Sequence, residues 1–239
     1  MCGRFVSARK RLELLEEFGV ERDRVAASPD PEPAPDYNVA PTKKIFAVLE
    51  RPAREEEPQA RELRVLRWGL VPSWAKDPKV GSRFINARRE TVGEKPAFRA
   101  AYQRRRCLVP ADGYFEWQQQ GGHKQPYFLA ARDRAPLAMA GLYEVWKAPD
   151  ESLLWTCTII TTEAADELGH IHDRTPLLVP RDAWSRWLDP EIEDPGQDLL
   201  VPGTPGVLDA WPVPPAVGNV KNNGPELVEP WTPEEQQLF

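Results

Sequence analysis

The sequence predicts a single α+β domain, built on a mainly antiparallel mixed sheet or barrel with a few short helices. Three observations predict this class. Many short runs have strand character, helical periodicity is confined to brief segments, and 26 prolines divide the 239 residues into short elements. The 15 glycines and 26 prolines together stay below the level typical of disordered chains, so they indicate turns and stiff loops.

Seven runs are expected to form strands, because they are rich in β-branched and aromatic residues and are bounded by turn residues. Residues 28–36 precede them as a loop, since proline fixes φ and lacks an N–H. In chain order the seven runs are Lys44–Leu49, Glu62–Trp68, Arg106–Val109, Gly113–Trp117, Tyr127–Ala130, Leu137–Tyr143 and Leu154–Thr161.

Four short helices are expected. The first is capped by Ser7 and ends at Gly19, where a left-handed residue can terminate the helix. Its apolar face comprises Leu12, Leu14, Leu15 and Phe18. The other three are Ala97–Gln103, Glu163–Leu168 and Asp182–Leu188, the last with Asp182 as its N-cap. No linker divides the chain, so we expect one domain over residues 2–230 and a C-terminal tail over 231–239.

Composition excludes several classes of protein. No apolar run approaches the length that spans a bilayer, and no apolar segment of a signal peptide follows the early charges. The three cysteines, at positions 2, 107 and 157, form neither a disulfide framework nor a zinc spacing. This usage is typical of a reducing compartment, and we expect a cytoplasmic protein.

The net charge of −6 argues against a protein that coats duplex DNA non-specifically. The stretch 83–106 is nevertheless rich in arginine and ends in Arg104–Arg106. Two interpretations remain open for this stretch: an ordinary solvated face, or an edge that contacts phosphates.

Cys2 is the most distinctive residue of the chain. Removal of Met1 would leave an α-amine and a thiol on one residue, and both groups have reactive fractions near neutral pH. Such an aminothiol can capture an aldehyde twice, first as an imine and then as a five-membered thiazolidine. Position alone favours a simpler interpretation, in which Cys2 is a small buried hydrophobe.

Glu116 is the strongest candidate for acid–base chemistry. On a strand it shares a face with Tyr114, while Phe115 and Trp117 point to the other side. Aromatic neighbours would partly desolvate the carboxylate and raise its pKa toward a useful value. The alternative is a glutamate on the wet face of a half-exposed strand.

Other polar and aromatic residues allow two interpretations each. His172 lies beside an Asp-Arg pair and is either a tuned proton donor or a surface histidine at a helix end. Asn86 and Arg88 would share a strand face and could hold a phosphate or polarise an oxygen, or be structural and surface residues. Trp68 and Trp74 flank a Gly/Pro turn, where tryptophans either fill a core or stack on bases.

Seven segments that follow one another along the chain together resemble the SRAP (SOS response-associated peptidase) family. The resemblance spans the chain from Cys2 to about residue 230, with one departure at Thr175. The segments are Met1–Phe5, Tyr37–Pro41, Trp68–Trp74, Ile85–Arg88, Asp112–Trp117, Ile171–Pro176 and Ala216–Asn222.

The resemblance implies a DNA-damage response protein that cross-links to abasic sites in single-stranded DNA. Met1 would be removed, the Cys2 amine would attack C1′ of the ring-opened deoxyribose, and the thiol would close a thiazolidine. Glu116 would shuttle protons, and His172 would assist sugar ring opening and the proton transfers of the Schiff base. We expect no cofactor or metal, no membrane partner, and a monomer.

The resemblance also implies which residues bind DNA. Asn86 and Asn38 would position the sugar and the N-terminus. The residues expected near the phosphates or the lesion are Arg4, Arg88, Arg174, Trp68 and Trp117.

Two alternatives remain open. One is an N-terminal-nucleophile cysteine hydrolase or peptidase, with the Cys2 thiolate activated by its own amine or by Glu116. The other is a single-strand-binding module whose polar cluster is structural. An imine without a thiazolidine would also permit strand nicking, which is a lyase activity.

Overall fold

A five-stranded barrel forms the centre of the computed structural model, which describes residues 2–28, 30–53, 55, 57–164, 167–196, 199 and 206–232. Neighbouring strands are antiparallel except at the closing pair, where Thr156 lies beside Arg67 and Cys157 beside Trp68 in parallel register. Closure leaves no free edge in the ring. In order around the ring, the strands are β5 (Arg61–Trp68), β4 (Lys44–Glu50), β7 (Arg106–Ala111), β10 (Leu137–Lys147) and β11 (Leu153–Glu163).

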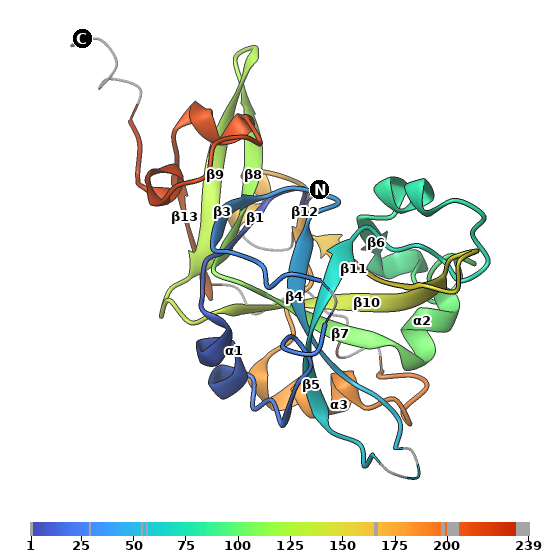
Figure 1. Ribbon diagram of the computed structural model, residues 1–239. Coiled ribbons are helices and arrows are strands. Elements are labelled where there is room, and N and C mark those ends of the chain that lie inside the picture. Colours follow the sequence, from blue (N-terminus) through green and yellow to red (C-terminus); the bar gives the residue numbers. More distant parts are fainter. Residues whose placement is uncertain are drawn as a thin grey trace.

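A second, antiparallel sheet continues from the barrel, because β7 passes through Asp112 directly into β8. Strands β8 and β9 form a long hairpin that rises above the barrel in Figure 1. In sheet order, the strands are β13 (Leu208–Pro212), β9 (His123–Ala131), β8 (Gly113–Gln120), β1 (Phe5–Ser7) and β3 (Asp36–Val39).

Three further short strands pair with the barrel: β2 (Arg22–Asp23) with β5, and both β6 (Asn86–Arg88) and β12 (Arg174–Pro176) with β11. The helices are brief. They comprise α1 (Arg11–Glu17), α2 (Arg99–Arg104) and α3 (Trp184–Leu188), with 3₁₀ turns η1 (Pro78–Arg83), η2 (Arg89–Thr91), η3 (Glu167–His170), η4 (Arg181–Ala183), η6 (Pro215–Gly218) and η7 (Pro225–Val228). None of the helices in the described ranges could cross a bilayer.

Alternation along the barrel strands separates two main cores. Phe46 and Val48 of β4 pack with residues of the three α-helices, which lie along the outside of the barrel (Figure 1). The intervening Ile45 and Ala47 belong to the second core, which fills the barrel interior and includes Cys2. Burial on both faces explains why β4 is apolar along most of its length.

The structure confirms the predicted class and all seven predicted strands, with β9 and β10 longer than expected. The prediction that Ser7 caps the first helix is wrong, because Ser7 lies in β1 and pairs with Asp36. Helix α1 instead begins after Lys10, whose backbone N–H donates to Glu13 Oε2 at 3.1 Å. Leu12 is 70% exposed and does not join the apolar face of that helix.

Two other helix predictions need correction. Glu163 ends β11, where it pairs with Arg174, and the part of this segment that the structure describes as helical is the 3₁₀ turn Glu167–His170, while residues 165–166 lie outside the described residues. Asp182 lies within η4, and α3 begins at Trp184. In both places a strand or turn fixed by tertiary contacts prevails over local helix propensity. Most of the expected tail, residues 233–239, lies outside the described residues.

The Arg104–Arg106 run does not form a phosphate-contacting edge. Arg106 is buried beneath α3 and donates to five backbone carbonyls, those of Tyr102, Gln103, Trp187, Asp189 and Ile192. Arg105 pairs with Glu144 and Arg104 with Glu193. This run therefore ties the α2 and α3 segments to the barrel.

Gly113 begins β8 in a space that no larger residue fits. A Cβ at this position would lie 2.3 Å from Phe128 Cζ and 2.5 Å from the Leu129 carbonyl oxygen. We expect Gly113→Ala to lower the free energy of unfolding by about 1–3 kcal/mol through overpacking. Gly218→Ala is the control, since a Cβ there meets nothing within 4 Å. Urea denaturation that gives equal stabilities for both variants would contradict the expected strain.

Candidate active site

Cys2 lies in the barrel-interior core, completely buried. The chain reaches it from β1, which pairs with β8 so that Phe5 lies opposite Tyr114 and the Phe115 N–H donates to the Arg4 carbonyl. The same register, continued past β1, places Gly3 opposite Glu116, and the adjacent Cys2 thiol lies close enough to feel the charge of that carboxylate. Burial raises the pKa of the Cys2 thiol far above its usual range, and the nearby charge of Glu116 acts in the same direction.

Glu116 is held on β8 with only 3% of its surface exposed. Burial raises its pKa to about 7. The predicted strand face is observed, because Tyr114 and Glu116 line the same cavity. A carboxyl with this pKa is present in both protonation states at neutral pH, as a proton shuttle requires.

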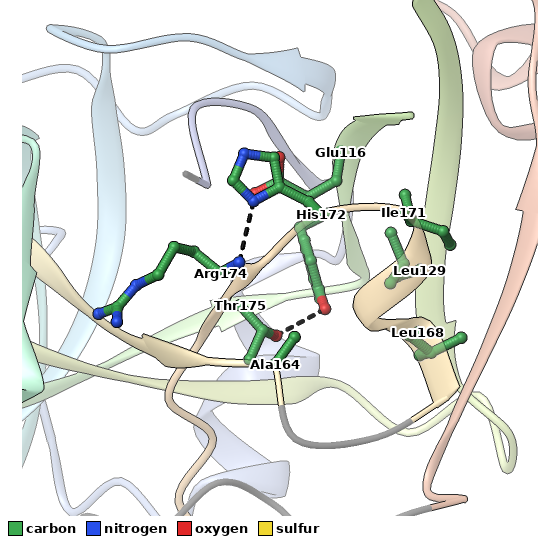
Figure 2. A pocket seen from close by; sticks show the side chains of 9 residues that line it. Glu116, Leu129, Ala164, Leu168, Ile171, His172, Arg174 and Thr175 are labelled. Atoms are coloured by element: carbon green, nitrogen blue, oxygen red, sulfur yellow. Dashed lines mark hydrogen bonds and ion pairs between the residues drawn. The ribbon is translucent and has the colours of Figure 1, made fainter. Parts of the chain in front are cut away.

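His172 faces Glu116 across the cavity, with its Nε2 3.9 Å from Glu116 Oε2. Its Nδ1 accepts from the Arg174 backbone N–H at 2.9 Å (Figure 2), so the neutral ring carries its proton on Nε2, directed toward Glu116. The Asp173 carboxylate also lies 2.9 Å from Nδ1 but is 88% exposed, and water screens it. Burial lowers the pKa of His172 and thereby favours the neutral ring.

The cavity between these groups is lined by polar side chains on one side and by Leu129, Leu168 and Ile171 on the other (Figure 2). At its side the hydroxyl groups of Tyr114 and Thr175 lie 2.8 Å apart in a hydrogen bond. This hydrogen bond fixes the Thr175 side chain in one wall of the cavity. The lining residues are Tyr114, Glu116, Leu129, Ala164, Leu168, Ile171, His172, Arg174 and Thr175.

Asn86 approaches Cys2 from the opposite side. Strand β6 pairs with β11 at Ile159, and Asn86 Nδ2 donates to the Cys2 carbonyl at 2.7 Å. Its buried Oδ1 accepts no hydrogen bond from any described residue. Arg88, two residues further along the same strand, is exposed, as the predicted alternation requires.

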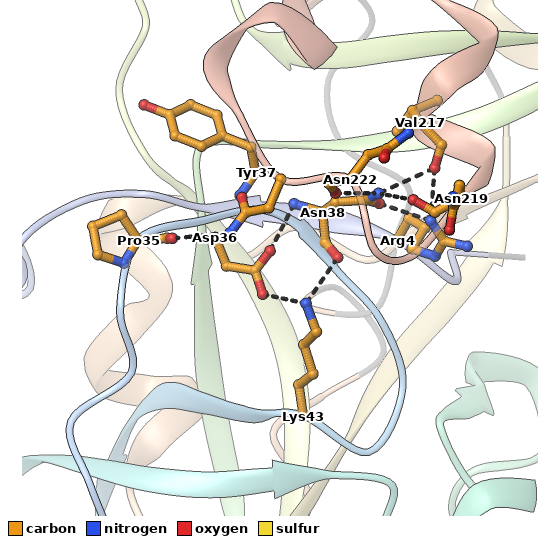
Figure 3. A network of polar contacts seen from close by, with 10 residues as sticks. Arg4, Pro35, Asp36, Tyr37, Asn38, Lys43, Val217, Asn219 and Asn222 are labelled. Atoms are coloured by element: carbon orange, nitrogen blue, oxygen red, sulfur yellow. Dashed lines mark hydrogen bonds and ion pairs between the residues drawn. The ribbon is translucent and has the colours of Figure 1, made fainter.

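The side chains of Asn38 and Arg4 form a clamp on the segment 216–223 (Figure 3), while the backbone of Arg4 hydrogen-bonds the Cys2 thiol. The buried Asn38 amide donates to the carbonyls of Val217, Asn219 and Asn222 at 3.0–3.1 Å. Its Oδ1 accepts from Arg4, whose guanidinium also donates to the Val217 carbonyl at 2.8 Å. Asn38 and Arg4 had expected roles elsewhere, whereas the segment 216–222 was matched only as a motif and none of its residues was assigned a role.

The other predicted site residues, Trp68, Trp117 and Arg174, contact other parts of the protein around the site. Trp68 is fully buried in the same core as Cys2, where its indole N–H donates to the Ile85 carbonyl and its edge meets Phe5. Trp117 is partly exposed beneath the Arg4 guanidinium. The Arg174 guanidinium is hydrogen-bonded to Glu90. Contact of Arg4 or Arg174 with phosphates stays a prediction.

The described part of the chain contains no cluster of side chains that could bind a metal ion. No three His, Cys, Asp or Glu side chains gather there in a way that could hold a metal ion.

The fold and this site define a class of protein: a closed barrel that presents a cysteine near its amino end to an acid–base pair. The chain belongs to the SOS response associated peptidase (SRAP) family, whose model matches residues 1–220.

Curated relatives match nearly the full chain. The abasic site processing protein YoqW of Bacillus subtilis is 38% identical over 232 residues, which cover 96% of this chain and 99% of YoqW. The abasic site processing protein YedK of Escherichia coli is also 38% identical, over 96% of this chain and all of YedK. A crystal structure of a Bacteroides thetaiotaomicron protein superposes with a TM-score of 0.83 at 25% identity, covering 97% of this chain and 100% of that chain.

The raised pKa of Glu116 makes stability depend on pH. In the folded protein this pKa lies at about 7, above its ordinary 4.5, so ionisation destabilises the fold as pH rises through 7. Glu116→Gln cannot ionise, and we expect it to be about 3 kcal/mol more stable than wild type at pH 8, with the gain lost below pH 4.5. Denaturation across pH 4–8 measures the difference. A gain that does not vary with pH would contradict the burial argument.

Loss of the Asn38 amide should loosen the clamp on segment 216–223. Asn38→Ala removes a donor from the carbonyls of Val217, Asn219 and Asn222, of which only the Val217 carbonyl still accepts from Arg4, and we expect the free energy of unfolding to fall by about 1–3 kcal/mol. The matched control is Asn223→Ala on the same segment, where the hydrogen bonds are exposed to water. If urea denaturation gave the same loss in the free energy of unfolding for both variants, the clamp would contribute no more to stability than the exposed hydrogen bonds.

Proposed function

We propose that the chain processes abasic sites in single-stranded DNA by forming a covalent thiazolidine between Cys2 and the lesion, once Met1 has been removed. The observation that carries this proposal is the buried Cys2 beside Glu116, a carboxyl whose pKa is raised to about 7. Family membership and the names of the relatives support the same substrate.

The reaction proceeds in two bond-forming steps. The Cys2 amine attacks C1′ of the open-chain aldehyde, and loss of water from the carbinolamine gives an imine. The thiol then adds to the imine carbon, and its proton passes to the nitrogen, which closes the ring without any oxidant. Glu116 accepts the proton that the amine loses and returns it to the departing hydroxyl.

His172 and Asn86 serve the sugar in this mechanism. As the lesion opens, Glu116 takes the proton of the C1′ hydroxyl and returns it to the ring oxygen, to which the Nε2–H of neutral His172 donates a hydrogen bond. Asn86 holds the Cys2 carbonyl, and its Oδ1 is available to accept from the amine or from a sugar hydroxyl. Exposed Arg88 lies beside Asn86, where it can contact the neighbouring phosphate. Since the lesion has no base, phosphate and aldehyde contacts must carry recognition.

The hydrolase alternative is less well supported. A cysteine hydrolase needs the thiolate as its nucleophile, and such thiols have a lowered pKa. Burial and the charge of Glu116 move the pKa of Cys2 in the opposite direction. An amine-first reaction has no such requirement, because the thiol enters only after the imine has formed.

The test is incubation of the processed protein with single-stranded DNA that contains one abasic site, followed by denaturing electrophoresis. We expect a protein–DNA band that survives denaturation, and none with intact DNA or with a borohydride-reduced site that lacks the aldehyde. Mass spectrometry of the N-terminus must first show that Met1 is absent, since an amide nitrogen cannot form the imine.

Two variants separate the functional groups. Cys2→Ser retains the amine but not the thiol, so we expect strand nicking through the imine and loss of the stable band. Cys157→Ser is the control, because this second buried cysteine lies inside the barrel and has no role in the reaction. A stable band with Cys2→Ser, or peptide hydrolysis by a wild type that forms no band, would overturn the mechanism.

A further inference from the structure

Two separate segments supply the groups that surround Cys2. His172 lies just before β12, and Asn86 lies on β6. Both strands pair with β11, β6 through Asn86–Arg88 and β12 through Arg174–Pro176. The relative position of His172 and Asn86 therefore depends on what ties these two short strands together across β11.

Arg174 makes that connection with its side chain. The guanidinium donates to both carboxylate oxygens of Glu90, at 2.8 and 3.1 Å, and to the Thr161 carbonyl of β11 at 2.7 Å. The side chain of Arg174 is only 13% exposed and that of Glu90 is 40% exposed. A bidentate pair of this kind fixes the orientation of the guanidinium relative to the carboxylate as well as their distance. Its partial burial limits screening by salt.

The backbone of Arg174 acts on His172 directly, because its N–H donates to His172 Nδ1. The same residue thus fixes the histidine tautomer through its backbone and reaches the Asn86 segment through its side chain. Glu90 follows β6 immediately, in η2. The connection runs without a gap from Asn86 through Glu90 and Arg174 to His172.

We propose that Glu90 is a positioning residue for the abasic-site reaction, which holds His172 in its working orientation through Arg174. This inference rests on the proposed function for the reaction, but the geometry it describes does not. Glu90 touches neither Cys2 nor Glu116 through any described contact, so its influence passes through Arg174.

A phosphate-binding role for Arg174 makes the opposite prediction for Glu90. If Arg174 served mainly to bind DNA, removing the Glu90 charge would release the guanidinium and strengthen DNA binding. If Arg174 serves to position His172, the same change leaves binding unaltered and slows the reaction. A single substitution at Glu90 therefore distinguishes the two roles.

The experiment compares Glu90→Gln with Glu94→Gln, an exposed glutamate four residues later that removes the same charge without contact to Arg174. Cross-linking rates are measured at saturating abasic single-stranded DNA between pH 5.5 and 9. Affinity is measured across salt concentrations with a tetrahydrofuran analogue, which lacks the aldehyde. We expect Glu90→Gln to cross-link about ten to a hundredfold more slowly, with affinity and salt dependence unchanged. Glu94→Gln should match wild type in both measurements.

A second readout does not require cross-linking. The chain has three histidines, so NMR titration can follow the His172 ring, assigned with His172→Asn. Burial lowers the pKa of His172 in the wild type, and loosening its segment in Glu90→Gln should move that pKa back up toward its ordinary value. Arg174→Lys, which keeps the charge but not the paired contact, should behave like Glu90→Gln.

The possible results distinguish failure of the positioning role of Glu90 from failure of the proposed function. An unchanged rate and an unchanged His172 titration in Glu90→Gln would overturn the positioning role, as would a gain in DNA affinity. Absence of any wild-type adduct would overturn the proposed function instead, and the titration would still decide whether Glu90 controls His172.

Discussion

The antiparallel pairing of β1 with β8 is the contact on which the site depends. It leads the chain into the barrel-interior core at Cys2, and it places Glu116, two residues after the Tyr114 that faces Phe5, near the Cys2 thiol. A slip of one residue would turn Glu116 to the opposite face of the sheet. Gly113 and the β7–β8 connection fix this register from one end, while β3 holds β1 from the other side.

Long strands could be predicted from sequence, and short ones could not. The seven predicted runs carry enough β-branched and aromatic residues to define themselves, and alternation on β8 placed Glu116 correctly. Strands β1, β6 and β12 have three residues each, and only their partners make them strands. The contacts of the Arg106 side chain could not be predicted from sequence either. Its backbone carbonyl acceptors come from segments that only the tertiary structure brings together.

The candidate site likewise contains residues that could be predicted from the sequence and contacts that could not. Cys2, Glu116, His172 and Asn86 were predicted and do converge, because each stands in a segment with its own chemical signal. The clamp on segment 216–223 and the link between Glu90 and Arg174 were not foreseen. Each joins residues more than eighty positions apart through carbonyls or carboxylates, and sequence spacing contains no trace of such contacts. Sequence identifies the reacting groups, whereas the structure identifies what aligns them.

Burial of Cys2 has a consequence for the lifetime of the protein in an oxidising environment. Peroxide and disulfide reagents attack the thiolate, so an exposed cysteine of low pKa is consumed between encounters with its target. A fully buried thiol that stays protonated reacts slowly with such oxidants. A thiol buried in this way therefore keeps its sulfur in the reduced state when oxidants are present.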